Sequence, residues 1–286
     1  MRRPAPTRRG RLARASLLSM TLALVVAAPL ASHDFWLIPD AFRIASGDRL
    51  EVSGQTSSSF PTTLSAVTVD RVAEARLVTA TGSEPTEDLS TRGNSLRLAH
   101  RPSTPGQALV AVRIHPRSIP ESPESFRNYL TLEGAPEALE RYEREGLMPT
   151  DSIVRRYAKY AKTLVHVGSG GSTAYDRHLG HPLEFVPLDD PEAVGAGGIL
   201  RFRLLLLGEP IAGARGHASA AAHRDAEHES GHATWETDRS GEISVEVTTP
   251  GIWNVRALYI LPAPAGSGAD WDVHWATFVW EVAGDG

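Results

Sequence analysis

The chain contains no cysteine among its 286 residues, and it has only three methionines, of which Met148 alone lies beyond the first twenty residues. Without cysteine, an exported protein of this sequence gains nothing from disulfide bonds and offers no thiolate to a metal ion. Nitrogen and oxygen ligands remain. This ligand set disfavours Cu(I) and leaves Ni(II), Co(II), Cu(II) or Zn(II) as the divalent transition metals that such a chain would bind.

Long apolar runs are missing after the first thirty residues. The one such run, from Leu17 to Leu30, follows six arginines and no acidic residue. A basic segment followed by an apolar segment predicts a signal peptide, here over residues 1–32, and the run is shorter than the roughly 20 residues of a membrane span. We therefore expect a soluble, exported, periplasmic protein that is cleaved after Ala31 or after Ser32.

Positive charge is scarce in the expected mature chain. Removal of the six signal arginines leaves 23 basic against 34 acidic residues, a net charge near −11. An acidic surface repels phosphate backbones, so nucleic acid is not an expected partner. The same charge suits the attraction of cations.

Enzyme signatures are absent as well. The sequence has no Gly-x-Ser-x-Gly elbow, no His-Glu-x-x-His pair and no dinucleotide fingerprint. The glycine-rich stretch 168–172 lacks the Gly-Lys-Ser/Thr ending of a phosphate-binding loop. We therefore predict that the protein is not an enzyme and uses no small organic cofactor.

What is present is a succession of strand-length apolar runs separated by turn residues. In residues 33–116 these runs predict an N-terminal β-sandwich domain, with strands at 50–53, 75–79, 95–100 and 108–114. In residues 173–286, seven further runs predict an immunoglobulin-like β-sandwich, with strands at 183–187, 199–207, 212–219, 234–237, 242–248, 253–261 and 274–282.

Residues 117–172 form the expected connector. Ser122 and Pro123 predict a helix start, because serine caps a helix and proline suits its first turn. Gly134 and Pro136 should split the helical stretch in two, and 153–167 predicts a long strand. The expected fold is therefore mainly β, with two antiparallel immunoglobulin-like sandwich domains joined by a short helical segment.

His33 is the first candidate metal ligand. If the signal is cut after Ser32, His33 begins the mature chain, and its main-chain amine and imidazole can close a chelate ring on a metal ion. A free α-amine has a pKa of roughly 7.7–8.0, so a metal ion can displace its proton near neutral pH. The alternative is that His33 merely opens a strand.

A second group of histidines lies in one short stretch. His223, His228 and His232 follow His217 within sixteen residues and alternate with acidic residues. Imidazole and carboxylate are the ligands that divalent metals take when thiolates are absent. Ser230-Gly231 indicates a loop, and the alternative is a solvated loop that is merely rich in histidine.

Two further histidines are candidates from their places on strands. Strand alternation puts His274 on one face with Asp272, Ala276, Phe278 and Trp280, where the alternative is a histidine at the edge of the core. His166 lies at the end of the strand expected at 153–167 and could approach a site from the domain junction.

The order of several short motifs resembles a known bacterial family: His-Asp-Phe-Trp at 33–36, Phe126-x-x-Tyr129-Leu130 with Glu133-Gly134, Arg156-Tyr157-Ala158-Lys159, Leu179-Gly180-x-Pro182-Leu183-Glu184, and Asp270-Trp271 with Trp275-Ala276. The family comprises exported proteins of unknown function, commonly labelled as nickel or cobalt uptake substrate-specific components. The resemblance implies a periplasmic β-rich protein that binds a transition metal, with His33 as the matching ligand. The cluster from His217 to His232 lies where such proteins vary.

These observations favour a soluble periplasmic protein that binds nickel or cobalt, with copper or zinc as alternatives, for delivery to an inner- or outer-membrane metal transporter. Neutral imidazole is the active ligand, so binding should weaken as pH falls through about 6.5. One alternative is a non-catalytic envelope structural or interaction protein, favoured by the strand-turn-strand stretch at 208–214. Another is a copper monooxygenase, which would need a second ligand from His100, His166 or His274.

Overall fold

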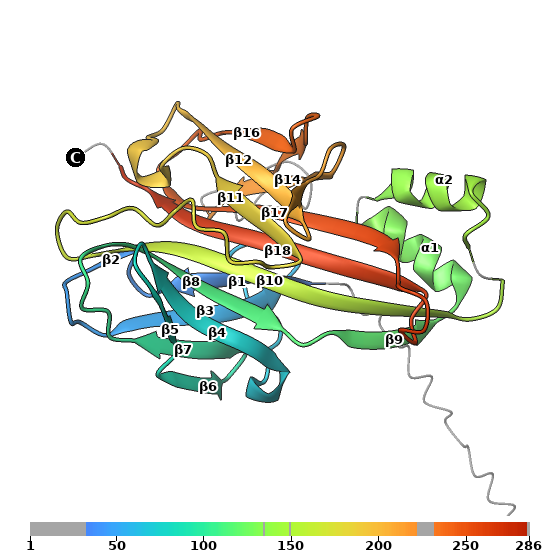
Figure 1. Cartoon of the computed structure of the whole chain (residues 1–286), viewed down its shortest axis with the longest axis horizontal. Helices are drawn as coiled ribbons and strands as arrows, with labels where there is room; N and C mark the ends of the chain where they lie inside the picture. Colours follow the sequence, from blue (N-terminus) through green and yellow to red (C-terminus); the bar gives the residue numbers. More distant parts are fainter. Residues whose placement is uncertain (1–32, 134, 149, 222–231, 285–286) are drawn as a thin grey trace, which may run out of the picture. The chain divides into compact units, whose positions relative to one another are not determined.

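A computed structural model of the chain describes residues 33–133, 135–148, 150–221 and 232–284, and residues 32–286 form one compact unit. The unit is mainly β. Two long strands, β10 (Ile153–Val167) and β18 (Trp271–Val282), run side by side through its centre (Figure 1). They pair in parallel, from Arg155 opposite Trp271 to Thr163 opposite Val279.

The two long strands belong to a ten-stranded sheet. Its order is β15-β14-β17-β18-β10-β8-β4-β5, and β2 and β9 also pair with β10. The remaining strands of this sheet are β2 (Arg43–Ile44), β4 (Val72–Thr79), β5 (Ser83–Pro85), β8 (Gly106–Ile114), β9 (Arg117–Glu121), β14 (Arg215–Ala220), β15 (His232–Glu236) and β17 (Gly251–Pro262). Strands from both halves of the sequence thus lie in one continuous sheet.

The segment expected to act as a connector supplies the middle strand of this sheet. β10 has the bounds that the sequence predicts, but it pairs with β8 on one side and β18 on the other. Its pairing with β18 is parallel, whereas the expected sandwiches are antiparallel throughout. Burial gives the physical reason, because β10 is covered on both faces over most of its length and parallel strands occupy such doubly covered positions.

A four-stranded sheet covers one face of the ten-stranded sheet. It has the order β1-β3-β7-β6 and consists of β1 (Asp34–Pro39), β3 (Leu50–Ser57), β7 (Ser95–His100) and β6 (Asp88–Arg92). Ala161, Val165 and Val167 of β10 pack in the core between these two sheets. The four strands come from the first third of the chain.

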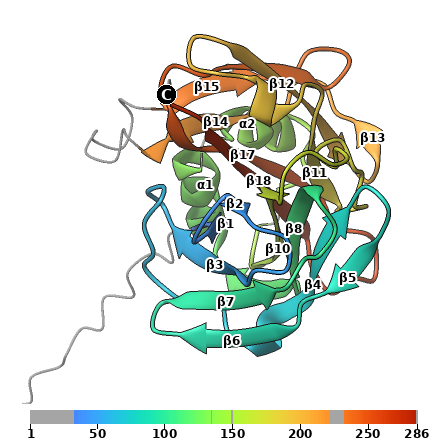
Figure 2. The same ribbon diagram turned by 90° about the vertical axis from the view of Figure 1, so that its left-hand side faces the viewer.

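A third sheet covers the opposite face. It contains β11 (Leu183–Pro187), β12 (Ile199–Leu206), β13 (Glu209–Pro210) and β16 (Glu242–Glu246). Ala158, Tyr160 and Leu164 of β10 face this layer, because side chains alternate along a strand. Figure 2 shows the β1-β3-β7-β6 sheet and the third sheet on opposite sides of β10 and β18.

Two short helices cover the remaining part of the face on which β1 lies. They are α1 (Pro123–Leu132) and α2 (Pro136–Arg144), so the predicted split is confirmed. The Ser125 amide donates to Ser122 Oγ over 3.1 Å, which caps α1 as its sequence predicts. Phe126 and Tyr142 pack on the ring of Trp271 at the start of β18. Two 3₁₀ turns, η1 (Val69–Arg71) and η2 (Pro191–Ala193), complete the described elements.

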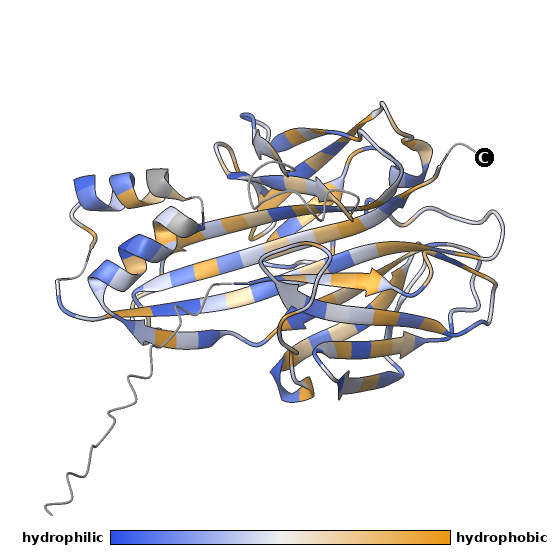
Figure 3. Ribbon diagram, turned by 180° about the vertical axis from the view of Figure 1, so that it is seen from behind, coloured by the Kyte–Doolittle hydropathy of each residue, from blue (hydrophilic) through white to orange (hydrophobic). Residues whose placement is uncertain are grey.

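The alternation of apolar and polar residues along the strands is visible in Figure 3. On β18 it has the predicted phase: Ala276, Phe278 and Trp280 face the third sheet, and Trp271 and Trp275 face the helices. The side of each strand that is buried is therefore fixed by its sequence pattern.

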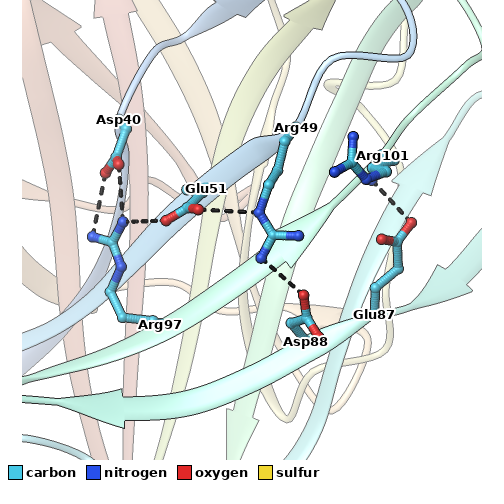
Figure 4. A network of polar contacts seen from close by, with 7 residues as sticks. All are labelled: Asp40, Arg49, Glu51, Glu87, Asp88, Arg97 and Arg101. Carbon is cyan, nitrogen blue, oxygen red and sulfur yellow. Dashed lines mark hydrogen bonds and ion pairs between the residues drawn. The ribbon is translucent and has the colours of Figure 1, made fainter.

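The outer face of the β1-β3-β7-β6 sheet carries a chain of ion pairs (Figure 4). Arg97 bridges Asp40 and Glu51, and Arg49 bridges Glu51 and Asp88, with contacts of 2.8–3.0 Å. Each charge in this chain of contacts has an opposite neighbour. In the described part of the chain, no helix has the length and apolar character that crossing a membrane requires.

Candidate functional site

The first strand of the expected mature chain is held against the central strands of the fold by hydrogen bonds and an ion pair. Lys159 Nζ of β10 donates a hydrogen bond to the main-chain oxygen of His33, and Thr277 Oγ1 of β18 donates to the oxygen of Phe35 over 2.6 Å. Arg256 of β17 lies 3.4 Å from the Asp34 carboxylate. Three strands of the ten-stranded sheet therefore fix the position of His33.

The His33 side chain is half-buried, and its Nδ1 atom is buried without a hydrogen-bond partner among the described residues. Burial lowers the pKa of the imidazole, and the nearby Lys159 lowers it further, whereas Asp34 opposes the shift. The ring is therefore neutral at neutral pH. Within one histidine, Nδ1 and the α-amine can close a six-membered ring on a metal ion, so the unpartnered atom is the one that such a chelate would use.

Charged groups surround this position. Burial lowers the pKa of Lys159 to about 8, against the opposing effect of Asp34 and Glu133. Burial also raises the pKa of Glu133, at the end of α1, to about 7, and Asp34 adds to that shift while Arg256 opposes it. The cluster of Asp34, Glu133, Lys159 and Arg256 thus contains two groups that change charge within about one pH unit of neutrality.

His274 lies on the other side of the ten-stranded sheet. It is adjacent to Trp275 in β18, and Trp275 faces the helices. The His274 Nδ1 atom lies 3.0 Å from the Tyr160 hydroxyl, in the layer formed with the third sheet. The sheet therefore separates His274 from His33, and burial lowers the pKa of the His274 imidazole.

His166 is distant from both. It lies seven positions beyond Lys159 on β10, which corresponds to about 23 Å along an extended strand. Its Nδ1 atom contacts the Glu192 carboxylate at 2.8 Å, and that carboxylate also lies 3.2 Å from Arg43. The structure therefore does not bring His33, His166 and His274 together at one site.

The histidine-rich stretch is largely outside the described residues. His223 and His228 lie in the segment 222–231, whereas His232 begins β15. Within the described residues, no group of three or more histidine, aspartate and glutamate side chains is arranged to hold a metal ion. A metal site at His33 would therefore need the α-amine as an additional ligand.

Sequence reasoning missed Lys159, Glu133 and Arg256 as neighbours of His33. One signal was available, because Lys159 and Lys162 are the only lysines in the sequence and both lie in the buried β10. A lysine pair in the middle of an apolar strand indicates a structural or functional role, since lysine is almost never fully buried unless it is paired.

Similar structures were found at low identity. The chain is 13% identical to a Salmonella alpha-2-macroglobulin mutant, with a TM-score of 0.21, over 94% of this chain and 16% of that one. It is 11% identical to Escherichia coli alpha-2-macroglobulin activated by porcine elastase, with a TM-score of 0.23, over 88% of this chain and 20% of that one. It is 12% identical to a protein from Corynebacterium diphtheriae described as a "Putative membrane anchored protein", with a TM-score of 0.21, over 88% of this chain and 59% of that one. The chain thus spans a fifth or less of the alpha-2-macroglobulins.

A search of curated proteins finds no significant match. A family profile described as "Domain of unknown function (DUF4198)" matches residues 30–261, which is most of the chain. This agrees with the resemblance to a family of unknown function that the sequence motifs indicate. The chain therefore belongs to the family described as Domain of unknown function (DUF4198).

Proposed function

We propose that this protein is a periplasmic, non-catalytic binding protein for a divalent transition metal ion, nickel or cobalt in the first place and copper or zinc as alternatives. His33 is the proposed ligand, through its α-amine and its Nδ1 atom. The metal ion is the cargo, and a membrane metal transporter is the proposed recipient.

One observation carries the proposal. The Nδ1 atom of His33 is buried, has no hydrogen-bond partner among the described residues and belongs to an imidazole whose pKa is lowered. A buried polar atom without a partner costs roughly 1–3 kcal/mol, and a metal ion would remove that cost. The contacts from Lys159 and Thr277 hold the surrounding backbone in place, so little ordering would be needed on binding.

The carboxylates of the cluster lie near His33 but, among the described residues, are not arranged with it as a set of three metal ligands. Asp34 follows His33 directly, and Asp34 and Glu133 interact electrostatically. Lys159 and Arg256 balance these carboxylates in the metal-free protein, so the apo cluster does not require a cation for charge balance.

The test is calorimetric titration of Ni(II), Co(II), Cu(II) and Zn(II) into natively exported protein whose first residue has been established by mass. A variant with one alanine added before His33 moves the α-amine away and should lose tight binding. The matched control is His115→Ala, an exposed histidine at the end of β8, which should bind as the wild type does. Equal binding by the extended variant would refute the N-terminal site.

Amine labelling gives a second, independent readout. With Ser32 removed, the mature chain has three primary amines: its α-amine and those of Lys159 and Lys162. Both lysines are buried, so an amine-reactive reagent should label the α-amine first in the folded protein. Saturating Ni(II) should slow that labelling at least tenfold if the amine binds the metal. Unchanged labelling, together with absent heat of binding, would favour the envelope structural or interaction protein.

We also propose that the two cores correspond to the two sandwiches expected from the sequence, with β10 shared between them. One core lies under the β1-β3-β7-β6 sheet and the other under the β11-β12-β13-β16 sheet. Two resolved calorimetric transitions would support separate sandwich domains. A single two-state transition would show one cooperative unit.

A further inference from the structure

A cavity of about 770 Å³ lies between α2 and strands β14, β15 and β17. It is on the side of the ten-stranded sheet that the helices cover. Its volume falls within the roughly 300–1,000 Å³ typical of small-molecule sites. The described histidine site does not account for this space.

The sheet wall of the cavity is polar. In the register of the sheet, Arg256 of β17 lies opposite His217 of β14, and His217 lies opposite Thr234 of β15. Arg215 and Glu236 form the neighbouring pair of β14 and β15. Cross-strand partners share one face of a sheet, so these side chains stand together on the cavity side.

The helix wall combines small residues with arginines. Ala138, Arg141 and Arg144 of α2 line the cavity, together with Ala135, which caps the start of this helix. Alanine side chains leave room between the helix and the sheet. Arg141 contacts the Tyr142 hydroxyl at 2.7 Å, and neither Arg141 nor Arg144 has a carboxylate partner among the described residues.

Positive charge exceeds negative charge around the cavity. Four arginines line it, against the two carboxylates Glu133 and Glu236. Glu236 lies 2.8 Å from Arg215, and Arg256 lies 3.4 Å from Asp34, so these charges are balanced locally. The guanidinium groups of Arg141 and Arg144 in α2 have no carboxylate partner of this kind among the described residues. A cationic cavity in an expected mature chain of net charge near −11 indicates a specific anionic ligand.

We propose that this cavity binds a small organic anion with two or more carboxylate groups, which Arg141 and Arg144 recognise. Guanidinium groups present planar pairs of donors that match a carboxylate. Leu258 and Ile260 of β17 supply apolar wall for the carbon skeleton of the ligand. The inference does not rest on metal binding at His33.

Citrate is the probe for the test, titrated by calorimetry into mature protein that has been freed of metal on a chelating resin, in a buffer that contains no other polycarboxylate. The R141Q/R144Q variant should weaken citrate binding at least tenfold. The matched control is R117Q/R127Q, which removes the same charge from exposed positions outside the cavity and should stay within twofold of the wild type. An equal loss of citrate affinity in both variants would show that binding depends only on the overall electrostatic potential of the protein, and it would overturn the proposal.

A third variant leaves the charge unchanged. Ala138→Leu places a larger side chain into the cavity and should also weaken citrate binding at least tenfold. Sulfate at the same ionic strength should not compete, and full competition would overturn the carboxylate assignment. The variant with an added residue before His33 should bind citrate normally, which distinguishes failure of this site from failure of the metal site. Absence of citrate binding to the wild type at millimolar concentration would refute the inference.

Discussion

Lys162 of β10 and Glu184 of β11 form an ion pair inside the core between the central and third sheets. Their side chains are each 2% exposed, and Lys162 Nζ lies 2.9 Å from Glu184 Oε1. The carboxylate also accepts main-chain hydrogen bonds from Leu179, Gly180 and His181 over 2.7–3.2 Å. One carboxylate thus fixes both a strand and the loop before β11.

Removal of the lysine should leave a buried, unpaired carboxylate. Burial lowers the pKa of Lys162, whereas the pKa of Glu184 is lowered because Lys162 and the amide donors outweigh the effect of burial. Loss of one partner of a buried pair costs about 3–5 kcal/mol. For a chain of this size, about 2–4 °C in Tm per kcal/mol then predicts a decrease of about 6–20 °C for Lys162→Met.

The assay is urea unfolding at pH 7, followed by tryptophan fluorescence, within a double-mutant cycle. Glu184→Gln retains an oxygen acceptor for the loop amides but removes the charge. The double variant Lys162→Met/Glu184→Gln should therefore be more stable than Lys162→Met alone, because no charge remains buried without a partner. The control is Arg127→Met, which breaks an exposed pair with Glu143 and should cost about 0–1 kcal/mol.

Two results would refute this reasoning. A cost below about 1 kcal/mol for Lys162→Met would show that the carboxylate is not held unpaired in the core. Additive effects in the double variant would show that the two side chains do not interact energetically.

Stability should rise with pH between about 4 and 6.5, because burial lowers the pKa of His100 to about 4 and of His181 to about 3, so the unfolded chain binds more protons in this range. Each group should contribute up to about 1.4 kcal/mol per pH unit, and urea unfolding of the His181→Gln variant should show a shallower dependence. Gly216→Ala should prevent folding or lower Tm severely, because its Cβ would lie 2.1 Å from a main-chain oxygen of β17, whereas Gly82→Ala meets nothing within 4 Å and should leave Tm unchanged. Arg97→Ala, on the outer face of its sheet, should lower the free energy of unfolding far less than Lys162→Met does, and added salt should shrink the difference.

Each of these outcomes has a clear opposite. An unchanged pH slope in the His181→Gln variant would mean that this imidazole is not kept neutral by burial. Normal folding of the Gly216→Ala variant would mean that β14 and β17 can separate at this position without cost. An effect of Arg97→Ala as large as that of Lys162→Met would mean that the surface ion pairs are as important as the buried one.

Much of the secondary structure could be predicted from local patterns. The bounds of β7, β10 and β11 agree with their predicted runs, and α1 begins at the predicted cap. These signals lie within about fifteen neighbouring residues. The turn before β16 is also stabilised locally, since Asp238 accepts the Ser240 amide, but β15 and β16 lie in different sheets, so the turn does not join a hairpin.

The candidate site was predictable only in part. His33 follows from its place after the expected signal peptide, but its neighbours do not, because Lys159 lies 126 positions away in sequence and Arg256 lies farther still. His166 and His274 are plausible ligands as residue types. Their positions on the opposite face of the sheet from His33 depend on the phase of each strand relative to the layers that cover it.

The sequence by itself determined the bounds of β7, β10 and β11, the start of α1, which residues of β18 share a face, and that any metal would be bound by nitrogen and oxygen atoms. Those properties depend on residue types and on spacings within one segment. The tertiary structure alone decided that β10 and β18 pair in parallel, that Lys159 meets the backbone of His33, and that arginines of α2 face the cavity beside β14. These contacts join segments far apart in the chain, and the burial of both faces of β10 between two layers selects them.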